Sequence, residues 1–323
     1  MSSIYPEDPR ERTRWILEKR PNWDERRQRL SQNPPVNWLL EEEPDAAHTP
    51  IAALTIFLTN RECPWRCLMC DLWQYTTLES LPMGSVPVQI DRVLNQALPW
   101  PSSGVSRHLK LYNAGSFFDR RAIPPADHST IAERCRAFER VIVECHPSLI
   151  GDEVWRFRDR LGGGTALEVA MGLETANPEV LAKLNKGLDL EGFERAAERL
   201  RRHGVDLRVF VLVKPPFVSD HDAVTWAVRS VDWSFELGAT VVTVIPTRLG
   251  NGALDALMAA GEFSPPNIDL LEAAFAECLA VARGRGRVLA DVWNLELFCS
   301  GQSDDSTRRK ARLHRVNLSQ KWQ

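Results

Sequence analysis

The chain is organised around the stretch Cys63-Pro64-Trp65-Arg66-Cys67-Leu68-Met69-Cys70. Its three cysteines follow a C-x3-C-x2-C spacing, which places three thiols on one short loop. Thiolate sulfur is the preferred protein ligand of iron–sulfur clusters and a common ligand of zinc, and closed sites of both kinds use four ligands. Three clustered cysteines without an obvious fourth predict a metal centre with one coordination position left open.

Two other interpretations of this loop remain open, a structural zinc site and a chance cluster. A zinc site usually shows a second C-x2-C pair or a pair of histidines. The remaining cysteines, Cys135, Cys145, Cys278 and Cys299, are scattered and form no second pair. The spacing therefore favours an iron–sulfur site.

Length and composition describe an ordinary globular chain. Its 323 residues, 44% apolar and 26% charged, are enough for one large domain or two modest ones. No apolar run reaches 18 residues and the N-terminus lacks the order of a secretory signal, so we expect no membrane association. Seven cysteines, three of them clustered, suit a reducing cytoplasm. The net charge of −3 offers no general attraction for nucleic acid.

The fold class expected is α/β, a partial (β/α)6 barrel, because apolar strands alternate with helices of ten or more residues. The strand before the cysteine loop runs from Ile51 to Thr59. Five more strands are expected at Leu109–Tyr112, Val141–Glu144, Leu167–Met171, Leu207–Val213 and Thr240–Ile245. One helix has clear signals, with Asn177 as its cap, Pro178 in its first turn and Gly187 at its end. Functional residues should gather at the carboxyl ends of the strands.

Three regions are expected along the chain: a helical preface at 1–50, the barrel at 51–251 and an α/β extension at 252–323 that covers the substrate. The preface has charged helices from Arg10 to Arg20 and from Asp24 to Leu30, and Glu41-Glu42-Glu43-Pro44 interrupts it before the core begins. Its basic residues alternate with acids, so a solvated face is the simpler interpretation and nucleic-acid contact the alternative.

The extension carries a helix from Ile268 to Ala282, a strand from Val288 to Trp293, and a basic helix from Arg308 to Arg315. The basic helix either covers the sheet or contacts RNA phosphates. Arg248, Asp291 and Glu296 either face a substrate cavity or are ordinary polar residues. No catalytic residue is predicted.

A buried strand that leads into a three-cysteine loop resembles the start of a radical S-adenosylmethionine (SAM) enzyme. In that superfamily three cysteines hold a 4Fe–4S cluster, and SAM chelates the fourth iron. The resemblance implies that Cys63, Cys67 and Cys70 hold the cluster and that the barrel is of the radical SAM type. It also implies an electron donor such as flavodoxin or ferredoxin.

The strand ends carry candidates for binding SAM. Asn113, Gly115 and Ser116 follow the second strand, where radical SAM enzymes use a glycine-rich turn to meet the methionyl amino group. An ordinary turn is the alternative. Glu144 ends the third strand, where a carboxylate accepts hydrogen bonds from both ribose hydroxyls.

Three further segments resemble the superfamily branch of the oxygen-independent coproporphyrinogen oxidases and elongator-type proteins. They are Val-Ile-Val-Glu144-Cys-His-Pro, Met-Gly-Leu-Glu174-Thr and Leu-Asn-Lys186-Gly. The resemblance implies that Glu144 holds the ribose and that Glu174 and Lys186 stand near the SAM carboxylate, although Lys186 would also complement a helix C-terminus. Glu174 replaces a glutamine of that branch and Lys186 an arginine, which loses the bidentate fork. Glu62 stands where glycine is common, and Met69 where an aromatic residue is usual.

The charged preface, the Cys-Pro-Trp-Arg-Cys loop, Leu-Tyr-Asn-Ala-Gly-Ser-Phe and Gly-Leu-Glu-Thr resemble the radical SAM subunit of archaeosine synthase, over roughly residues 10 to 300. That family acts on a lysine-modified deazaguanine in tRNA, cleaves a C–N bond and works with a separate tRNA-docking subunit. The resemblance implies tRNA modification, with tRNA or a partner subunit as partners.

The mechanism that the superfamily resemblance implies begins with reductive cleavage of SAM. The resulting 5′-deoxyadenosyl radical abstracts a substrate hydrogen, in a lyase or a transferase. Two alternatives stay open: a small metabolite as substrate, which the acidic net charge favours, and a non-catalytic metal-stabilised protein.

Overall fold

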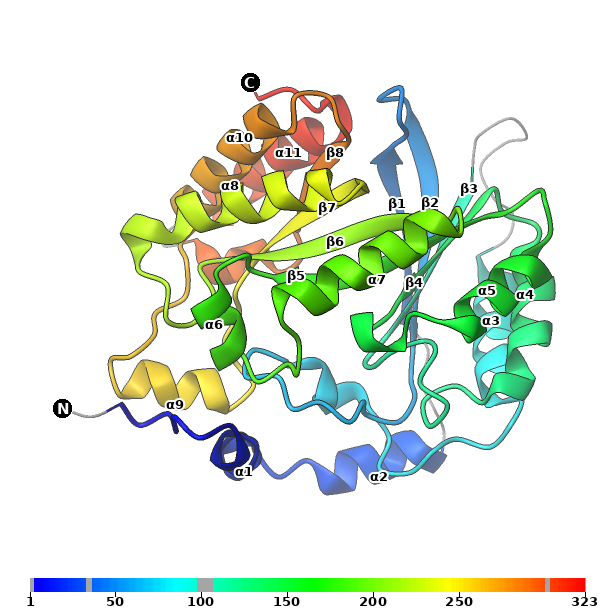
Figure 1. Cartoon of the computed structure of the whole chain (residues 1–323), viewed down its shortest axis with the longest axis horizontal. Helices are drawn as coiled ribbons and strands as arrows, with labels where there is room; N and C mark the ends of the chain where they lie inside the picture. Colours follow the sequence, from blue (N-terminus) through cyan, green and yellow to red (C-terminus); the bar gives the residue numbers. More distant parts are fainter. Residues whose placement is uncertain (1–2, 33–36, 98–106, 300–302, 323) are drawn as a thin grey trace.

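The computed structural model describes residues 3–32, 37–97, 107–299 and 303–322. Within these residues the strands form one eight-stranded sheet in the order β1-β2-β3-β4-β5-β6-β7-β8 (Figure 1). The first pair is antiparallel and the other strands are parallel. The strands are β1 Asn37–Pro44, β2 Pro50–Leu58, β3 Arg107–Asn113, β4 Arg140–Glu144, β5 Ala166–Glu174, β6 Asp206–Val213, β7 Ala239–Pro246 and β8 Arg287–Ala290.

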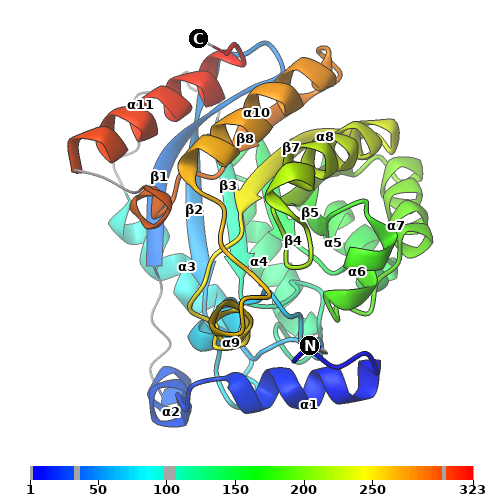
Figure 2. The same cartoon turned by 90° about the vertical axis from the view of Figure 1, so that its left-hand side faces the viewer.

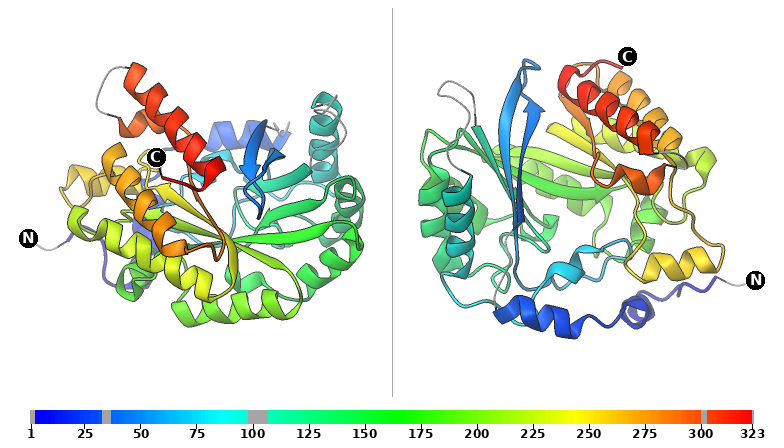
Figure 3. Two further views of the ribbon diagram at one scale, coloured as in Figure 1. Left: turned by 90° about the horizontal axis from the view of Figure 1, so that it is seen from above. Right: turned by 180° about the vertical axis from the view of Figure 1, so that it is seen from behind.

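Helices follow most of the parallel strands and lie along the outer side of the curled sheet (Figure 3). The α-helices are α1 Pro9–Lys19, α2 Asp24–Gln32, α3 Ser85–Gln96, α4 His128–Cys135, α5 Asp152–Leu161, α6 Pro178–Lys183, α7 Leu190–Arg202, α8 Asp220–Glu236, α9 Ala253–Ala259, α10 Ile268–Ala282 and α11 Ser303–Ser319. The described residues also form the short 3-10 helices η1 Leu72–Tyr75, η2 Pro125–Asp127, η3 Pro147–Leu149 and η4 Leu295–Phe298. No helix of the described chain combines the length and apolar character that crossing a membrane requires.

The α/β partial barrel expected from the sequence is confirmed. The six predicted strands correspond to β2 through β7, and β8 continues the sheet as expected, although it ends at Ala290 rather than Trp293. The helix capped by Asn177 ends at Lys183, earlier than Gly187, because Asn185 turns into the left-handed region with φ +55°.

One strand is absent from the prediction. Residues of Glu41-Glu42-Glu43-Pro44, interpreted as an interruption of a helical preface, form the second half of β1, which pairs with β2 at the edge of the sheet. An acidic strand is unusual. Its carboxylates form ion pairs with cations of other strands: Lys110 of β3 contacts both Glu41 and Glu43.

The alternation of side chains along each strand separates an apolar core from a polar interior. One set packs against the helices and forms the main hydrophobic cluster, as in Leu109, Leu111, Val141, Val143, Val169, Met171, Val209 and Val211. The opposite set faces the concave side and includes Lys110, Glu168 and Arg208. The carboxyl ends of the strands lie at the end of the barrel that α1, α2 and α9 cover (Figure 2).

The basic C-terminal helix covers the sheet, as the first of its two interpretations expects. Leu313 and Val316 of α11 are buried. The amide of Asn317 bonds both backbone groups of Ala290, at 2.8 and 2.9 Å, along the free edge of β8. Arg287 of β8 donates to the Pro44 carbonyl of β1 at 2.7 Å. The helix and this bond connect the two edges of the sheet.

Candidate functional site

The cysteine loop follows β2 and is held by segments far away in the sequence. The Leu68 N–H donates to the Leu184 carbonyl at 2.9 Å. Asn251 Nδ2 donates to the Leu68 carbonyl at 2.7 Å, and Asn185 Nδ2 donates to the Arg66 carbonyl at 2.8 Å. The Leu68 side chain is fully buried against α1 and α9. These contacts fix the loop at the carboxyl ends of the strands.

Cys63, Cys67 and Cys70 are free, partly exposed residues of this loop. Burial raises the pKa of all three thiols, that of Cys67 to about 12, against the influence of Lys186. Within the described chain, no three histidine, cysteine, aspartate or glutamate side chains form a group that would hold a single metal ion. Thiolates that each bind a separate iron of a cluster need no common centre.

A buried ion pair, Lys186 with Glu174, lies near the loop. Lys186 Nζ is 2.5 Å from Glu174 Oε1 and 2.6 Å from the Gly172 carbonyl. Burial alone would lower the pKa of Lys186, but Glu174 raises it above its ordinary value. A Cβ at residue 172 would lie 2.2 Å from Glu174 Oε1 and 2.5 Å from Lys186 Nζ. Glycine at this position therefore leaves the space that the ion pair occupies.

Glu144 and Asn113 meet where β3 and β4 end. Glu144 Oε2 accepts the backbone N–H of Asn113 at 3.2 Å, and burial raises the pKa of Glu144 to about 8. The Asn113 side chain is almost fully buried, and its Oδ1 and Nδ2 have no hydrogen-bond partner among the described residues. A Cβ at Gly115 would lie 3.5 Å from Asn113 Nδ2 and 3.6 Å from the Cys63 nitrogen. The Gly115 turn thus touches both the unpartnered amide and the cysteine loop.

Sequence reasoning missed the stacked pair of Trp65 and His146. The rings lie 3.6 Å apart at 10°. His146 Nε2 is 3.1 Å from the Lys186 carbonyl, and Nδ1 is 2.8 Å from Ser148 Oγ. The His146 backbone N–H donates to Ser116 Oγ at 2.9 Å, so Ser116 supports the histidine. Burial lowers the pKa of His146 to about 3, which keeps the ring neutral.

Glu62, directly before Cys63, is the centre of a charge cluster that the sequence indicated only as a departure from glycine. Its carboxylate pairs with Arg20 at 2.9 Å, with Arg27 at 3.3 Å and with Arg66 at 3.5 Å. Arg20 caps α1 and Arg27 belongs to α2. The N-terminal helices are therefore tied to the start of the cysteine loop, a use of their basic residues that neither sequence interpretation included.

Two of the three polar candidates from the C-terminal half come together. Arg248 Nη2 donates to Asp291 Oδ2 at 2.6 Å and to the Trp293 carbonyl at 2.9 Å, beyond the ends of β7 and β8. The Trp293 ring meets Phe57 of β2 edge-on at 5.0 Å. Glu296 lies exposed on η4.

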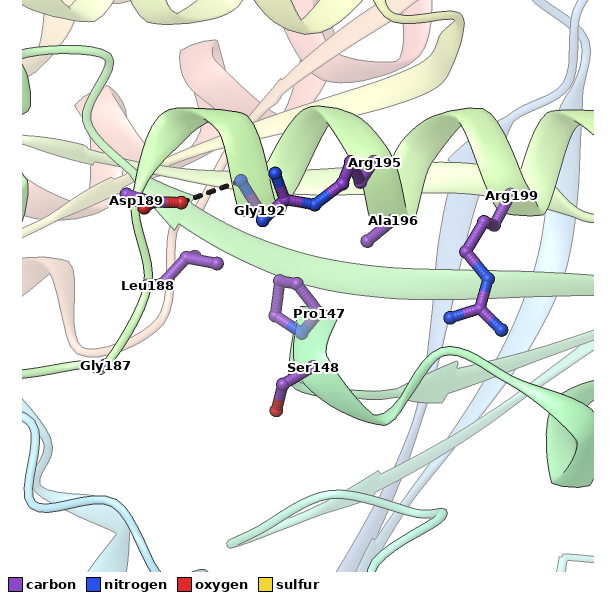
Figure 4. Close-up of a pocket in the computed structure, with 9 residues that line it drawn as sticks. All are labelled: Pro147, Ser148, Gly187, Leu188, Asp189, Gly192, Arg195, Ala196 and Arg199. Atoms are coloured by element: carbon purple, nitrogen blue, oxygen red, sulfur yellow. Dashed lines mark hydrogen bonds between the residues drawn. The ribbon is translucent and has the colours of Figure 1, made fainter.

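A groove with a volume of about 570 Å³ lies beside the His146 stack, between η3 and α7 (Figure 4). Pro147 and Ser148 form one wall, and Arg195 and Arg199 of α7 extend along the other. Gly187, which follows Lys186, closes one end. The groove therefore lies just outside the carboxyl ends of the strands that carry the other candidate residues.

Several solved structures are similar to this fold, and two of them superpose over most of the chain. Methylornithine synthase (PylB) superposes with a TM-score of 0.54 and 13% identity, covering 98% of this chain and 81% of that one. The Elp3 protein of Methanocaldococcus infernus, lacking its N-terminus, gives a TM-score of 0.51 and 13% identity over 72% of this chain and 59% of that one. The chain therefore shares the partial-barrel fold of these two proteins.

In sequence, the chain is similar to archaeosine synthase subunit beta of Methanosarcina acetivorans, with 26% identity over 221 residues. The match covers 66% of this chain and 63% of that protein, so it spans less than two thirds of the relative's length. No family model matches the chain.

Proposed function

We propose that this protein is a radical SAM enzyme in which Cys63, Cys67 and Cys70 hold a 4Fe–4S cluster and SAM occupies the open position. The observation that carries the proposal is the unpartnered, buried amide of Asn113, which lies beside the cysteine loop at the strand ends of a radical SAM barrel. A buried amide without a partner is costly unless a ligand satisfies it, so the site fits a polar ligand. When bound, the cluster supplies one electron for SAM cleavage, and the resulting 5′-deoxyadenosyl radical abstracts a substrate hydrogen.

Each SAM-binding residue then has a role that its contacts support. Asn113 and the Gly115 turn meet the methionyl end, and Ser116 supports that turn through His146. The free oxygen of Glu144 accepts hydrogen bonds from the ribose hydroxyls. Lys186 pairs with the SAM carboxylate while Glu174 keeps the ammonium in place.

We propose a modified nucleobase of the deazaguanine type in tRNA as the substrate, with a partner subunit that docks the tRNA. Support comes from the similarity to archaeosine synthase subunit beta. A net charge of −3 is consistent with leaving RNA binding to another subunit. An anaerobic pull-down from cells that retains no tRNA, even with a partner subunit present, would favour a small metabolite instead.

The class of enzyme is tested by anaerobic reconstitution with iron and sulfide. The unsubstituted protein should bind about four irons per chain and release 5′-deoxyadenosine from SAM under reduction. Cys63→Ala, Cys67→Ala and Cys70→Ala should each lose the cluster, whereas Cys299→Ala, a control outside the loop, should keep it. Undiminished iron in the three loop variants, or zinc in place of iron, would contradict the assignment.

A further inference from the structure

The proposed enzyme needs an electron from outside, and the fold restricts where a carrier reaches the cysteine loop. Leu68 and Met69 are packed against α1 and α9. Arg20 and Arg27 cover Glu62 at the start of the loop. On the side between the first two cysteines, Pro64 is exposed and Trp65 is half-buried. This side therefore remains open to a protein partner.

A short series of contacts connects that side with the groove beside α7. Trp65 stacks on His146, which bonds Ser148 in the groove wall. At the end of the groove, a Cβ on Gly187 would lie 3.2 Å from Trp65 Cδ1. The groove and the cysteine loop are thus connected through one stacked ring pair.

The other wall of the groove is positively charged. Arg195 and Arg199 are exposed one turn apart on α7 (Figure 4). Arg195 pairs with Glu191, while Arg199 has no ion pair among the described residues. The Asp189 carboxylate caps the helix by accepting the Gly192 N–H at 2.7 Å. The groove therefore keeps a cationic wall on a chain whose net charge is −3.

We propose that this surface, defined by Pro64, Trp65, Ser148, Gly187, Arg195 and Arg199, is the docking site of an acidic one-electron carrier protein, an inference that rests on the proposed function. Acidic side chains of the carrier bind the two arginines and orient its redox group toward the Trp65–His146 stack. The reduced carrier loses one electron and the cluster gains it, with no bond formed or broken. Opposite charges accelerate such an encounter, and salt weakens the effect.

The test compares two reductants on the reconstituted full-length protein. Reduced flavodoxin requires docking, whereas reduced methyl viologen is a small molecule that does not. The variant is Arg195→Glu with Arg199→Glu, and the control is Arg202→Glu, an exposed arginine of the same helix that pairs with Glu198. Stopped-flow absorbance follows reduction of the cluster, and calorimetry measures binding of oxidised flavodoxin.

We expect the double variant to accept electrons from flavodoxin roughly tenfold more slowly at low salt and to bind it more weakly. Reduction by methyl viologen should stay unchanged, and the control should match the unsubstituted protein. An unchanged flavodoxin rate, equal slowing with both reductants, or unchanged binding of oxidised flavodoxin would each overturn the docking site. Failure of the unsubstituted protein to build a cluster that methyl viologen reduces would overturn the proposed function instead.

Discussion

Glu144 shows how the structure changes the chemistry of a single predicted residue. Burial raises the pKa of its carboxyl to about 8, and Glu174 adds to the shift while the Asn113 N–H and Lys186 oppose it. In the unfolded chain the pKa is about 4.5. The protonated form therefore stabilises the fold below pH 4.5, and this contribution is lost as the pH rises through 8. The ionised carboxylate accepts hydrogen bonds from ribose hydroxyls more strongly than the protonated carboxyl does.

SAM affinity should therefore increase between pH 7 and 9. Glu144→Gln should weaken SAM binding about tenfold at pH 9, since hydrogen bonds to a charged group contribute about 1.5–3 kcal/mol. The variant should also lose the part of the pH dependence that Glu144 causes. Isothermal titration of both reconstituted proteins measures this, and the titration of SAM itself cancels in the comparison. Identical pH profiles would remove Glu144 from the SAM site.

At the scale of elements, α1 and α9 pack together against the cysteine loop. Ile16 of α1, Leu68 of the loop and Leu254 of α9 belong to one apolar cluster. The junction depends on Gly252, which precedes α9 with φ +85°, since a Cβ there would lie 2.1 Å from the Lys19 carbonyl oxygen. Backbone cannot move aside as a side chain can, so this close approach requires glycine.

Gly252→Ala should destabilise the protein by about 2–5 kcal/mol, from left-handed backbone strain together with overpacking. The matched control is Gly261→Ala beyond the other end of α9, where φ is +75° but nothing lies within 4 Å of the new Cβ. The control should cost only about 1–2 kcal/mol. Urea unfolding measures the free energy of unfolding of both variants. Equal losses of stability would show that the close approach to the Lys19 carbonyl does not require glycine at position 252.

At the scale of the whole molecule, a buried charge network joins strands that are distant in the sequence. Arg208 of β6 forms two bonds to Glu43 of β1, at 2.9 and 2.8 Å, and one to Glu168 of β5 at 2.6 Å. Lys110 of β3 is 2.5 Å from Glu43. Burial alone would raise the pKa of Glu43, but Arg208 and Lys110 hold it well below its ordinary value. The network connects one edge of the sheet to its interior.

Glu43→Gln should cost about 3–5 kcal/mol at pH 7, because it removes a buried carboxylate that two buried cations share and leaves Arg208 with Glu168 and Lys110 with Glu41 as their remaining ion-pair partners in this network. The stabilisation by ionised Glu43 is present above its unfolded-state pKa of about 4.5 and is lost as the pH falls through the lower folded-state value. The gap between the variant and the unsubstituted protein should therefore narrow below pH 4.5. Glu42→Gln, at the exposed neighbouring position, should change stability by less than about 0.5 kcal/mol. Unfolding curves at several pH values check both expectations. A difference in free energy of unfolding that stays constant with pH would contradict the expected direction of the pH dependence.

The sequence by itself determined the six parallel strands, the loop between β2 and η1, and the Asn177 cap. Each is a local property, because strand alternation, cysteine spacing and capping depend on residues close together in the chain. The roles of the cysteines and of the SAM-binding residues, and the division into three regions, stay predictions.

Only the tertiary structure decided which distant residues meet. From the sequence, the acidic residues of β1 were interpreted as an interruption of a helical region. In the folded chain, Lys110 and Arg208 of other strands pair with Glu43 and neutralise its charge. The stack of Trp65 on His146 and the arginine cluster around Glu62 likewise join separate segments. Ion pairing and burial depend on distances in the folded chain, and the spacing of residues along a sequence does not contain those distances.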